Sequence, residues 1–223
     1  PVAEEIECLG ASELDPEIYL GLDAGVALDY TKPSDIVVAA PTKVAFRITV
    51  HGISGHAAFP ERKINAAFVM AQTLARLPMG RLDEFTTANL GIMRSGTAIN
   101  VIPGTAYAEY EIRSHRKDVL DFHVKRVIGT IEGVVRENRV FALGPGGHGM
   151  GEDLPGGSLE DGSKIRYSQV DVAVEASYAG YQPDPTSRLV AKMKNAVAMA
   201  GREPQRVVAP GGADANLLHR PGP

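Results

Sequence analysis

The sequence contains a single cysteine, Cys8, among its 223 residues. An intramolecular disulfide and a zinc site built from several cysteines are therefore excluded. Basic residues are not in excess either: the formal net charge is −4, which offers no footprint for nucleic acid or an anionic membrane surface. No apolar run approaches the roughly 20 residues of a membrane-spanning helix, and the opening segment PVAEEIECLG lacks the regions of a signal peptide. We expect a soluble, cytoplasmic protein without nucleic-acid or membrane partners.

Hydrophobic residues make up 44% of the chain and follow regular periods over its central part. Alternating apolar residues predict strands over residues 42–50, 86–93, 105–114 and 169–178. Helical spacing predicts helices over residues 64–75, ended by Pro78, and 117–138. The order strand, helix, strand, strand, helix, strand is that of a split βαβ, or ferredoxin-like, module. We place this module at residues 43–181.

The two flanks differ from this module in character. Residues 1–42 contain two short apolar segments that predict strands, and residues 182–223 contain a predicted helix, a strand and a glycine turn. We interpret them as two parts of a second α/β domain into which the module is inserted. The Gly-rich segment 144–163 is too long for an ordinary connection, and we expect a mobile loop there. It does not join a strand to a following helix, which argues against a phosphate-binding loop.

Acidic residues stand where α/β sheets place their ligands. Glu4 and Glu5 are adjacent at a predicted strand end, and Asp29 ends the apolar stretch 24–28. Hydrolysis by a metal-activated water needs one carboxylate to carry the proton and others as metal ligands. Taken alone, the glutamate pair also suits a solvated surface, and Asp29 also suits a turn.

Several other polar residues are candidates for binding substrate. His51 and His56 lie among small residues in the segment HGISGHAAFP, where they are accessible and could ligate zinc. Asn100 and Arg113 provide an amide and a fixed cation, a pairing suited to a carboxylate, although Arg113 also suits plain solvation on a strand. The glycine turn, with Gly211 and Gly212, leads into a predicted helix, so its backbone amides could hold an anion or simply form a connection.

Together these segments resemble the peptidase M20 family, and most closely its peptidase T-like branch. AEEIECLGASELD looks like the family's EEIGLLGAKALD-type motif, and HGISGHAAFP looks like its G-x-x-x-H-A-G motif. TAINVIPGTAYAEYEIRS resembles the T-x-x-N-x-[IV]-P stretch that continues to [IL]-R-S, and PGGADAN is similar to GGSDAN. The resemblance implies a zinc-exopeptidase catalytic domain, present in part, with an inserted ferredoxin-like (βαββαβ) dimerisation lid.

The resemblance also implies roles for individual residues. Glu4 takes the place of the general base, while Glu5 and Asp29 take the places of ligands to two divalent metal ions, expected to be zinc. His56 takes the place of a histidine that reaches the partner subunit's active site, so a homodimer is expected. Asn100, Arg113, Gly211 and Gly212 match substrate-contacting positions. The implied reaction is hydrolysis of a peptide bond near the terminus of a short peptide.

Two departures from the family pattern affect the expected activity. None of the six histidines is followed two residues later by aspartate, so the family's H-x-D ligand pair is absent from this sequence. The family's last histidine ligand has no counterpart after the glycine turn. We therefore expect this chain to be incomplete, to bind zinc weakly and to hydrolyse peptides negligibly. Two alternatives stay open, a non-catalytic dimerisation or binding module and an amide hydrolase acting on N-acyl amino acids. An RNA-binding domain, which shares the element order, is disfavoured by the acidic third strand.

Overall fold

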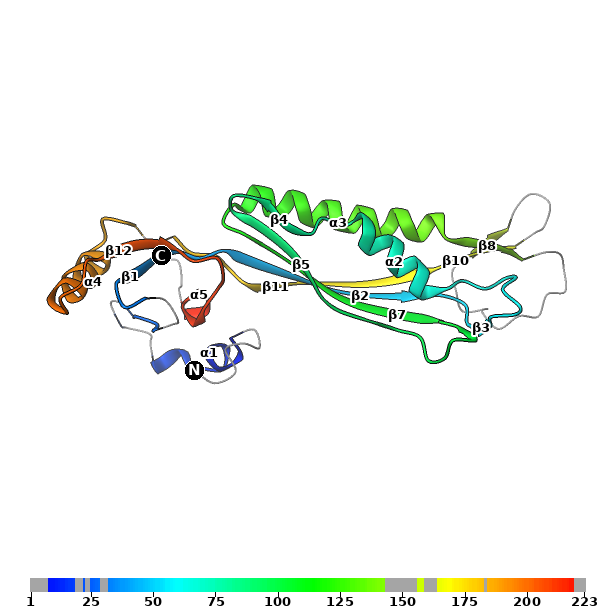
Figure 1. The fold of residues 1–223 in the computed structure, drawn as a ribbon, viewed down its shortest axis with the longest axis horizontal. Helices are drawn as coiled ribbons and strands as arrows, with labels where there is room; N and C mark the ends of the chain where they lie inside the picture. Colours follow the sequence, from blue (N-terminus) through cyan, green and yellow to red (C-terminus); the bar gives the residue numbers. More distant parts are fainter. Residues whose placement is uncertain are drawn as a thin grey trace.

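The computed structural model describes residues 8–18, 22, 25–28, 32–142, 156–158, 164–182 and 184–218. The chain forms an elongated molecule with two parts (Figure 1). One part, here called the sheet module (residues 42–178), is a long sheet with two helices. The other, the flanking unit, comprises the described residues outside that range and lies beyond one end of the sheet. The two ends of the described chain therefore lie in the same part of the molecule.

The sheet module contains a five-stranded antiparallel sheet with the order β11-β2-β7-β5-β4. Its strands are β2 (Thr42–His51), β4 (Gly80–Asp83), β5 (Thr86–Ser95), β7 (Thr105–Ser114) and β11 (Gln169–Tyr178). Helices α2 (Ala66–Arg76) and α3 (Lys117–Glu137) pack together against one face. Without the edge strand β4, the order is that of the ferredoxin-like arrangement, and this confirms the predicted fold class.

The core of the sheet module lies between the sheet and its helices. Phe46 and Ile48 of β2 are fully buried, as are Tyr110 of β7 and Ile131 of α3. Every second residue of β2 and β7 faces this layer, because successive side chains of a strand point to opposite faces. Complete burial of such a side chain contributes roughly 1.5–3 kcal/mol. The alternating pattern in the sequence therefore determines which face of the sheet the helices cover.

Helix α2 has clear local signals at both ends. The side chain of Asn65 caps its start by accepting a hydrogen bond from the backbone N–H of Phe68 at 3.1 Å. The helix ends at Arg76, and Leu77 is extended, as is typical of a residue that precedes proline. The predicted helix over 64–75, ended by Pro78, is thus confirmed to within two residues.

The flanking unit is built around two parallel strands. Strand β1 (Asp35–Ala39) pairs with β12 (Gln205–Val208), and α4 (Arg188–Met199) packs on β1 through Val197 and Met193. Three short elements complete it, namely α1 (Leu9–Ser12), the 3-10 helix η1 (Pro16–Ile18) and α5 (Asp214–Leu218). Segments from both flanks of the sequence therefore meet in one unit. None of the described helices is both long and apolar enough to cross a membrane.

One prediction about regular structure is wrong. Residues 25–28 were expected to end a strand, but they are described without regular structure, and Leu28 is 89% exposed. A strand needs a hydrogen-bonded neighbour, and no described strand pairs with them. In the expected loop 144–163, β9 (Gly156–Ser158) pairs with β10 (Lys164–Tyr167), which also pairs with β8 (Arg139–Ala142). Backbone groups alone make these pairs, so glycine does not prevent them. The rest of 144–163 lies outside the described residues.

Candidate functional site

His56 and Asn100 lie together at the end of the sheet module that is far from the flanking unit, here called the tip (residues 52–65 and 96–104). Strand β3 (Gly55–His56) pairs with β6 (Val101–Ile102), and His56 stands opposite Val101. The backbone N–H of Ala57 donates to the carbonyl oxygen of Asn100 at 2.9 Å. The sequence predicted both residues from separate motifs, and the structure brings their backbones into contact.

The loop that carries His56 is held close to the start of α2 by Gly52. A side chain at Gly52 would collide with the carbonyl oxygen of Ile64, so only glycine allows this approach. The neighbouring residue, Ile53, exchanges backbone hydrogen bonds with Ile64 at 2.9 and 3.2 Å. The segment HGISGH is therefore anchored to the core of the sheet module, and it presents His56 from a fixed base.

The imidazole of His56 is exposed and oriented by its own loop. Its Nδ1 accepts a hydrogen bond from the backbone N–H of Ala58 at 3.1 Å, and the ring of Phe59 lies 5.9 Å away. In the neutral ring the acceptor nitrogen carries no proton, so the proton is on Nε2. His56 therefore presents an N–H donor away from its loop. This is the form needed to donate to a carbonyl or an oxyanion.

Arg113 lies at the opposite end of β7, where the sheet module meets the flanking unit. Its Nε and Nη2 donate to the two carboxylate oxygens of Glu111 at 2.8 and 3.2 Å, and Lys43 is 3.3 Å from the same carboxylate. The Nη1 atom lies 3.4 Å from the position that a Cβ on Gly211 would take. The fork-shaped contact with Glu111 fixes the guanidinium plane beside the glycine turn.

The glycine turn is fastened to the last strand of the sheet module. The backbone N–H of Gly212 donates to the hydroxyl of Tyr178 at 3.2 Å, and a side chain at Gly212 would collide with that ring. The backbone N–H of Ala213 donates to the side chain of Asn216 at 3.0 Å. Both amides have partners within the chain, so in this structure neither is available to a substrate anion. The substrate-binding role expected of Gly212 stays a prediction.

Asn216 and Tyr178 are structural residues of this region that the sequence analysis did not single out. The amide group of Asn216, which is 4% exposed, donates to the carbonyls of Ala179 at 2.8 Å and Pro41 at 3.2 Å. These carbonyls belong to the two points where the chain passes between the sheet module and the flanking unit. Burial raises the pKa of Tyr178, which keeps its hydroxyl neutral. Asn216 is the final residue of the motif PGGADAN, but only its contacts in the structure show its structural role.

The tip and the region around Arg113 are far apart within one chain. Strand β7 runs from one to the other, and at about 3.3 Å per residue its ten residues span roughly 30 Å. Figure 1 shows the same separation, with β3 at one end of the molecule and β12 and α5 toward the other. His56 and Asn100 therefore cannot act on the same atoms as Arg113 within one subunit.

Comparisons with known proteins agree with this architecture. Residues 39–138 match the family model of the M20 peptidase dimerisation domain. The Bacillus subtilis protein YqjE is 28% identical over 97% of this chain and 51% of its own length. The aminopeptidase PepT from Bacillus cereus matches with a TM-score of 0.73 and 29% identity, over 97% of this chain and 51% of that one. A tripeptidase from Staphylococcus aureus matches with a TM-score of 0.75 and 26% identity, over 96% and 50%.

The chain contains the dimerisation domain of the peptidase M20 family, at residues 39–138. Within that family it is similar to the PepT-like branch, which confirms the resemblance expected from the motifs. The matched residues comprise most of the sheet module, up to the end of α3. The chain spans about half the length of the relatives that it matches.

The expected metal ligands of this M20 chain stay predictions. Glu4, Glu5 and Asp29 lie outside the described residues. Within the described part of the chain, no three His, Cys, Asp or Glu side chains are grouped so that they could hold a metal ion. The alternative zinc pair of His51 and His56 has no support there, since the Nε2 of His51 instead contacts Asp171 of the neighbouring strand at 2.8 Å. The described residues alone therefore do not provide the donor set of a metal centre.

Acidification is expected to weaken the contact between the two parts of this M20 chain through His115. The Nε2–H of His115 donates to the carbonyl of Ala209 at 3.0 Å. Burial holds the pKa of His115 below its ordinary value of 6.5, and this hydrogen bond opposes the shift only in part. The unfolded chain takes up a proton near pH 6.5 and the folded chain only at lower pH, so this stability is fully present above pH 6.5 and declines as the pH falls below it.

Urea unfolding at about pH 7.5 and about pH 5 measures this effect. The free energy of unfolding should fall more from the higher to the lower pH in the native chain than in the His115→Gln variant. His123, whose pKa is lowered mainly by burial and further by Arg126, is present in both proteins and cancels in the comparison. An equal loss in both proteins contradicts the role given to His115.

Proposed function

We propose that this chain is part of a metal-dependent exopeptidase that hydrolyses short peptides and works as a homodimer. The M20 peptidase dimerisation domain and the similarity to PepT-like tripeptidases support hydrolysis of a peptide or a related amide bond. The observation that carries the dimeric mechanism is the position of His56. It presents an N–H donor at the tip, roughly 30 Å along β7 from Arg113 and the glycine turn.

A homodimer can bring the tip and the region around Arg113 together, although they are far apart within one subunit. In a symmetric pair of subunits, the tip of one subunit can reach the region around Arg113 of the other, and the reverse contact follows by symmetry.

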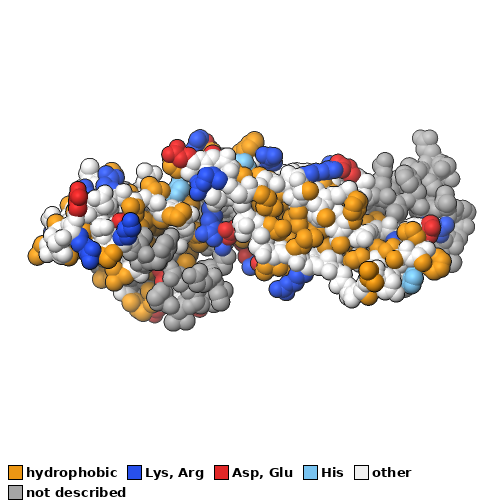
Figure 2. All heavy atoms as spheres, viewed as in Figure 1, with side chains coloured by type: hydrophobic (Ala, Val, Ile, Leu, Met, Phe, Trp, Pro, Cys, Tyr) orange, Lys and Arg blue, Asp and Glu red, His pale blue; other side chains and the backbone are white. Residues whose placement is uncertain are grey.

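The sheet module also offers the surface that pairing needs, because both edge strands, β4 and β11, have unpaired backbone groups on one side within the described structure. Its helices also expose large hydrophobic side chains, among them Phe68 at 58% and Phe122 at 61% exposure. Figure 2 shows hydrophobic side chains over much of this half of the molecule.

Each predicted site residue has a chemical task in this proposal. Glu4 accepts the proton of the attacking water and passes it to the leaving amine. His56 of one subunit donates its Nε2–H to the carbonyl oxygen that becomes negatively charged. Arg113, held in orientation by Glu111, faces a substrate carboxylate with its Nη1 edge, and Asn100 supports the tip that carries His56.

Glu5 and Asp29 are the residues of this chain that would hold metal ions. Two bound divalent ions, expected to be zinc, would supply a water molecule whose pKa is lowered toward neutrality. Carboxylate oxygens suit zinc, but a catalytic ion takes about three protein ligands. Two carboxylates are a partial donor set, so the proposal requires further ligands from elsewhere in the full-length gene product.

The proposal predicts tripeptidase activity in the product of the complete coding region. Purified full-length protein should hydrolyse Ala-Ala-Ala, lose this activity on treatment with a chelator and regain it with zinc, manganese or cobalt. The 223-residue chain should show negligible turnover beside it. Hydrolysis of N-acetyl amino acids instead of the tripeptide would identify an N-acyl amino acid hydrolase. A stable dimer without any hydrolysis would leave a dimerisation or binding module.

A further inference from the structure

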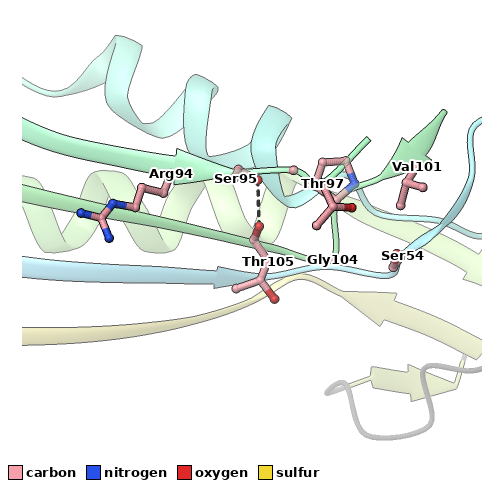
Figure 3. A pocket seen from close by; sticks show the side chains of 9 residues that line it. Ser54, Arg94, Ser95, Thr97, Val101, Gly104 and Thr105 are labelled. Atoms are coloured by element: carbon pink, nitrogen blue, oxygen red, sulfur yellow. Dashed lines mark hydrogen bonds between the residues drawn. The ribbon is translucent and has the colours of Figure 1, made fainter. Parts of the chain in front are cut away.

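A pocket lies at the edge of the tip, between the ends of β5 and β7 (Figure 3). It has a volume of about 450 Å³ and is lined by Ser54, Arg94, Ser95, Gly96, Thr97, Val101, Pro103, Gly104 and Thr105. Ligand pockets commonly measure roughly 300–1,000 Å³, so this one suits a group of the size of one or two amino acid residues. No role in binding was expected here from the sequence.

The lining of the pocket favours an anion. Arg94 is the one charged residue among the nine that line it. Two hydroxyls are used for internal support, because Ser54 donates to the carbonyl of Ile102 at 2.9 Å and Ser95 donates to that of Thr105 at 2.8 Å. The hydroxyls of Thr97 and Thr105 make no hydrogen bond within the described structure, so their O–H groups can donate to a ligand. Two hydroxyl donors therefore line the pocket, a positive charge stands at its rim, and no carboxylate is among the lining residues.

Arg94 differs from three arginines of the sheet module that are held by carboxylates. Arg47, Arg76 and Arg113 each contact a carboxylate within 3 Å, on Glu175, Glu137 and Glu111 respectively. Arg94 forms no such pair with any described residue, and it is exposed. Its guanidinium extends from the rim of the pocket along the sheet in Figure 3. Exposed side chains change rotamer within nanoseconds, so it can turn to meet a carboxylate, the group its planar donor fork suits best.

The pocket adjoins the group proposed to act on the substrate. Ser54 precedes His56 by two residues, and Val101, another lining residue, pairs with His56 between β3 and β6. A substrate bonded to the Nε2–H of His56 would place its neighbouring residue near this pocket. Binding there would add to the contacts of Arg113, which come from the opposite end of β7.

We infer that this pocket is a specificity subsite for a carboxylate of the substrate, with Arg94 as its anchoring residue. The inference rests on the proposed function and names its preferred substrates, which are peptides or acyl amino acids with an acidic group next to the bond that is cleaved. The carboxylate belongs either to an acidic side chain or to the end of the substrate.

Binding to the 223-residue chain tests the subsite without any catalysis. NMR titrations would use N-acetylglutamate, N-acetylglutamine and N-acetylisoglutamine, which carry both carboxylates, only the terminal one or only the side-chain one. Neutral N-acetylglutaminamide is the control. At least one carboxylate probe should shift the amide signals of Ser95, Thr97 and Thr105 saturably, with affinity at least about tenfold above the neutral control. The single-carboxylate probes then show which source of carboxylate the pocket takes.

Substitution of Arg94 completes the test. Affinity for the best probe should fall about tenfold in Arg94→Gln, recover in part in Arg94→Lys, and stay unchanged in the matched control Arg126→Gln, an exposed arginine of α3. Unshifted signals elsewhere would show that each variant is folded. Equal binding of charged and neutral probes, no saturable shift at the pocket, or full binding by Arg94→Gln would overturn the inference. Such a result leaves hydrolysis of Ala-Ala-Ala by the full-length protein untouched, whereas failure of that hydrolysis alone counts against the proposed function.

Discussion

Replacing His56 by alanine in the proposed full-length homodimer is expected to lower kcat by about 10²–10³-fold, the effect of removing one donor to a developing oxyanion. The backbone contact between Ala57 and Asn100 keeps the tip folded without the imidazole, so dimer formation should be unchanged. The KM for a tripeptide should change much less than kcat, because the donor acts mainly on charge that develops in the transition state. Steady-state kinetics, with size-exclusion chromatography of both proteins, measures both parts of the expectation.

The control for this experiment is His51→Ala. His51 lies near His56 in the sequence, but its imidazole pairs with Asp171 across the β2–β11 edge and takes no part in the proposed chemistry. Its loss should leave kcat close to that of the native enzyme. If both variants lose activity equally, the effect comes from the fold of the sheet module and not from a donor at His56.

Replacing Glu4 by glutamine is expected to abolish most turnover, by about 10²–10⁴-fold in kcat, because an amide cannot carry the proton of the attacking water. The change preserves size and removes only the charge and the basicity. Glu13→Gln is the matched control, since Glu13 is an exposed residue of the same region. Hydrolysis of Ala-Ala-Ala by the full-length variant measures the effect. Activity near the native level in Glu4→Gln would sink the assignment of Glu4 as general base.

The two variants together decide whether His56 acts across the dimer. When Glu4→Gln and His56→Ala subunits are co-expressed, half of randomly formed dimers are mixed. If each site uses Glu4 of one subunit and His56 of the other, a mixed dimer has one intact site and one with both changes. Activity should therefore return to about a quarter of the native value. If both residues acted within one subunit, every site would carry one change and no activity would return.

The fold of the sheet module was predictable because its signals are local. Residues 105–114 and 169–178 were predicted as strands and form β7 and β11 with these bounds, since a complete period-two pattern is bounded by polar turns. The edge strand β4 was missed because its four residues, GRLD, carry no period and pair only with β5. The strand expected before Asp29 was wrong for a related reason. An apolar run indicates a strand, but only a neighbouring strand provides its hydrogen bonds.

The candidate site was predictable in the identity of its residues but not in their arrangement. The motifs selected His56, Asn100 and Arg113, and the structure places the first two together and the third at the other end of β7. Neither the hydrogen bond that sets the tautomer of His56 nor the pairing of Arg113 with Glu111 has a sequence signal of its own. The sequence did not predict a role for Arg94, because a single exposed arginine in a strand forms no recognisable motif. Its place at the pocket and the absence of a described carboxylate partner are visible only in the structure.

The sequence by itself determined the order of the elements, the face of the sheet that the helices cover and the family of the protein. These depend on periods and motifs within short segments, where each residue acts through its near neighbours. Only the tertiary structure decided which distant segments meet. In the folded chain Gly212 donates a hydrogen bond to Tyr178, and Asn216 binds the two connections between the sheet module and the flanking unit. The tip and Arg113 lie at opposite ends of β7. Such contacts depend on strand register and on packing between residues far apart in the chain, and a local pattern carries no record of either.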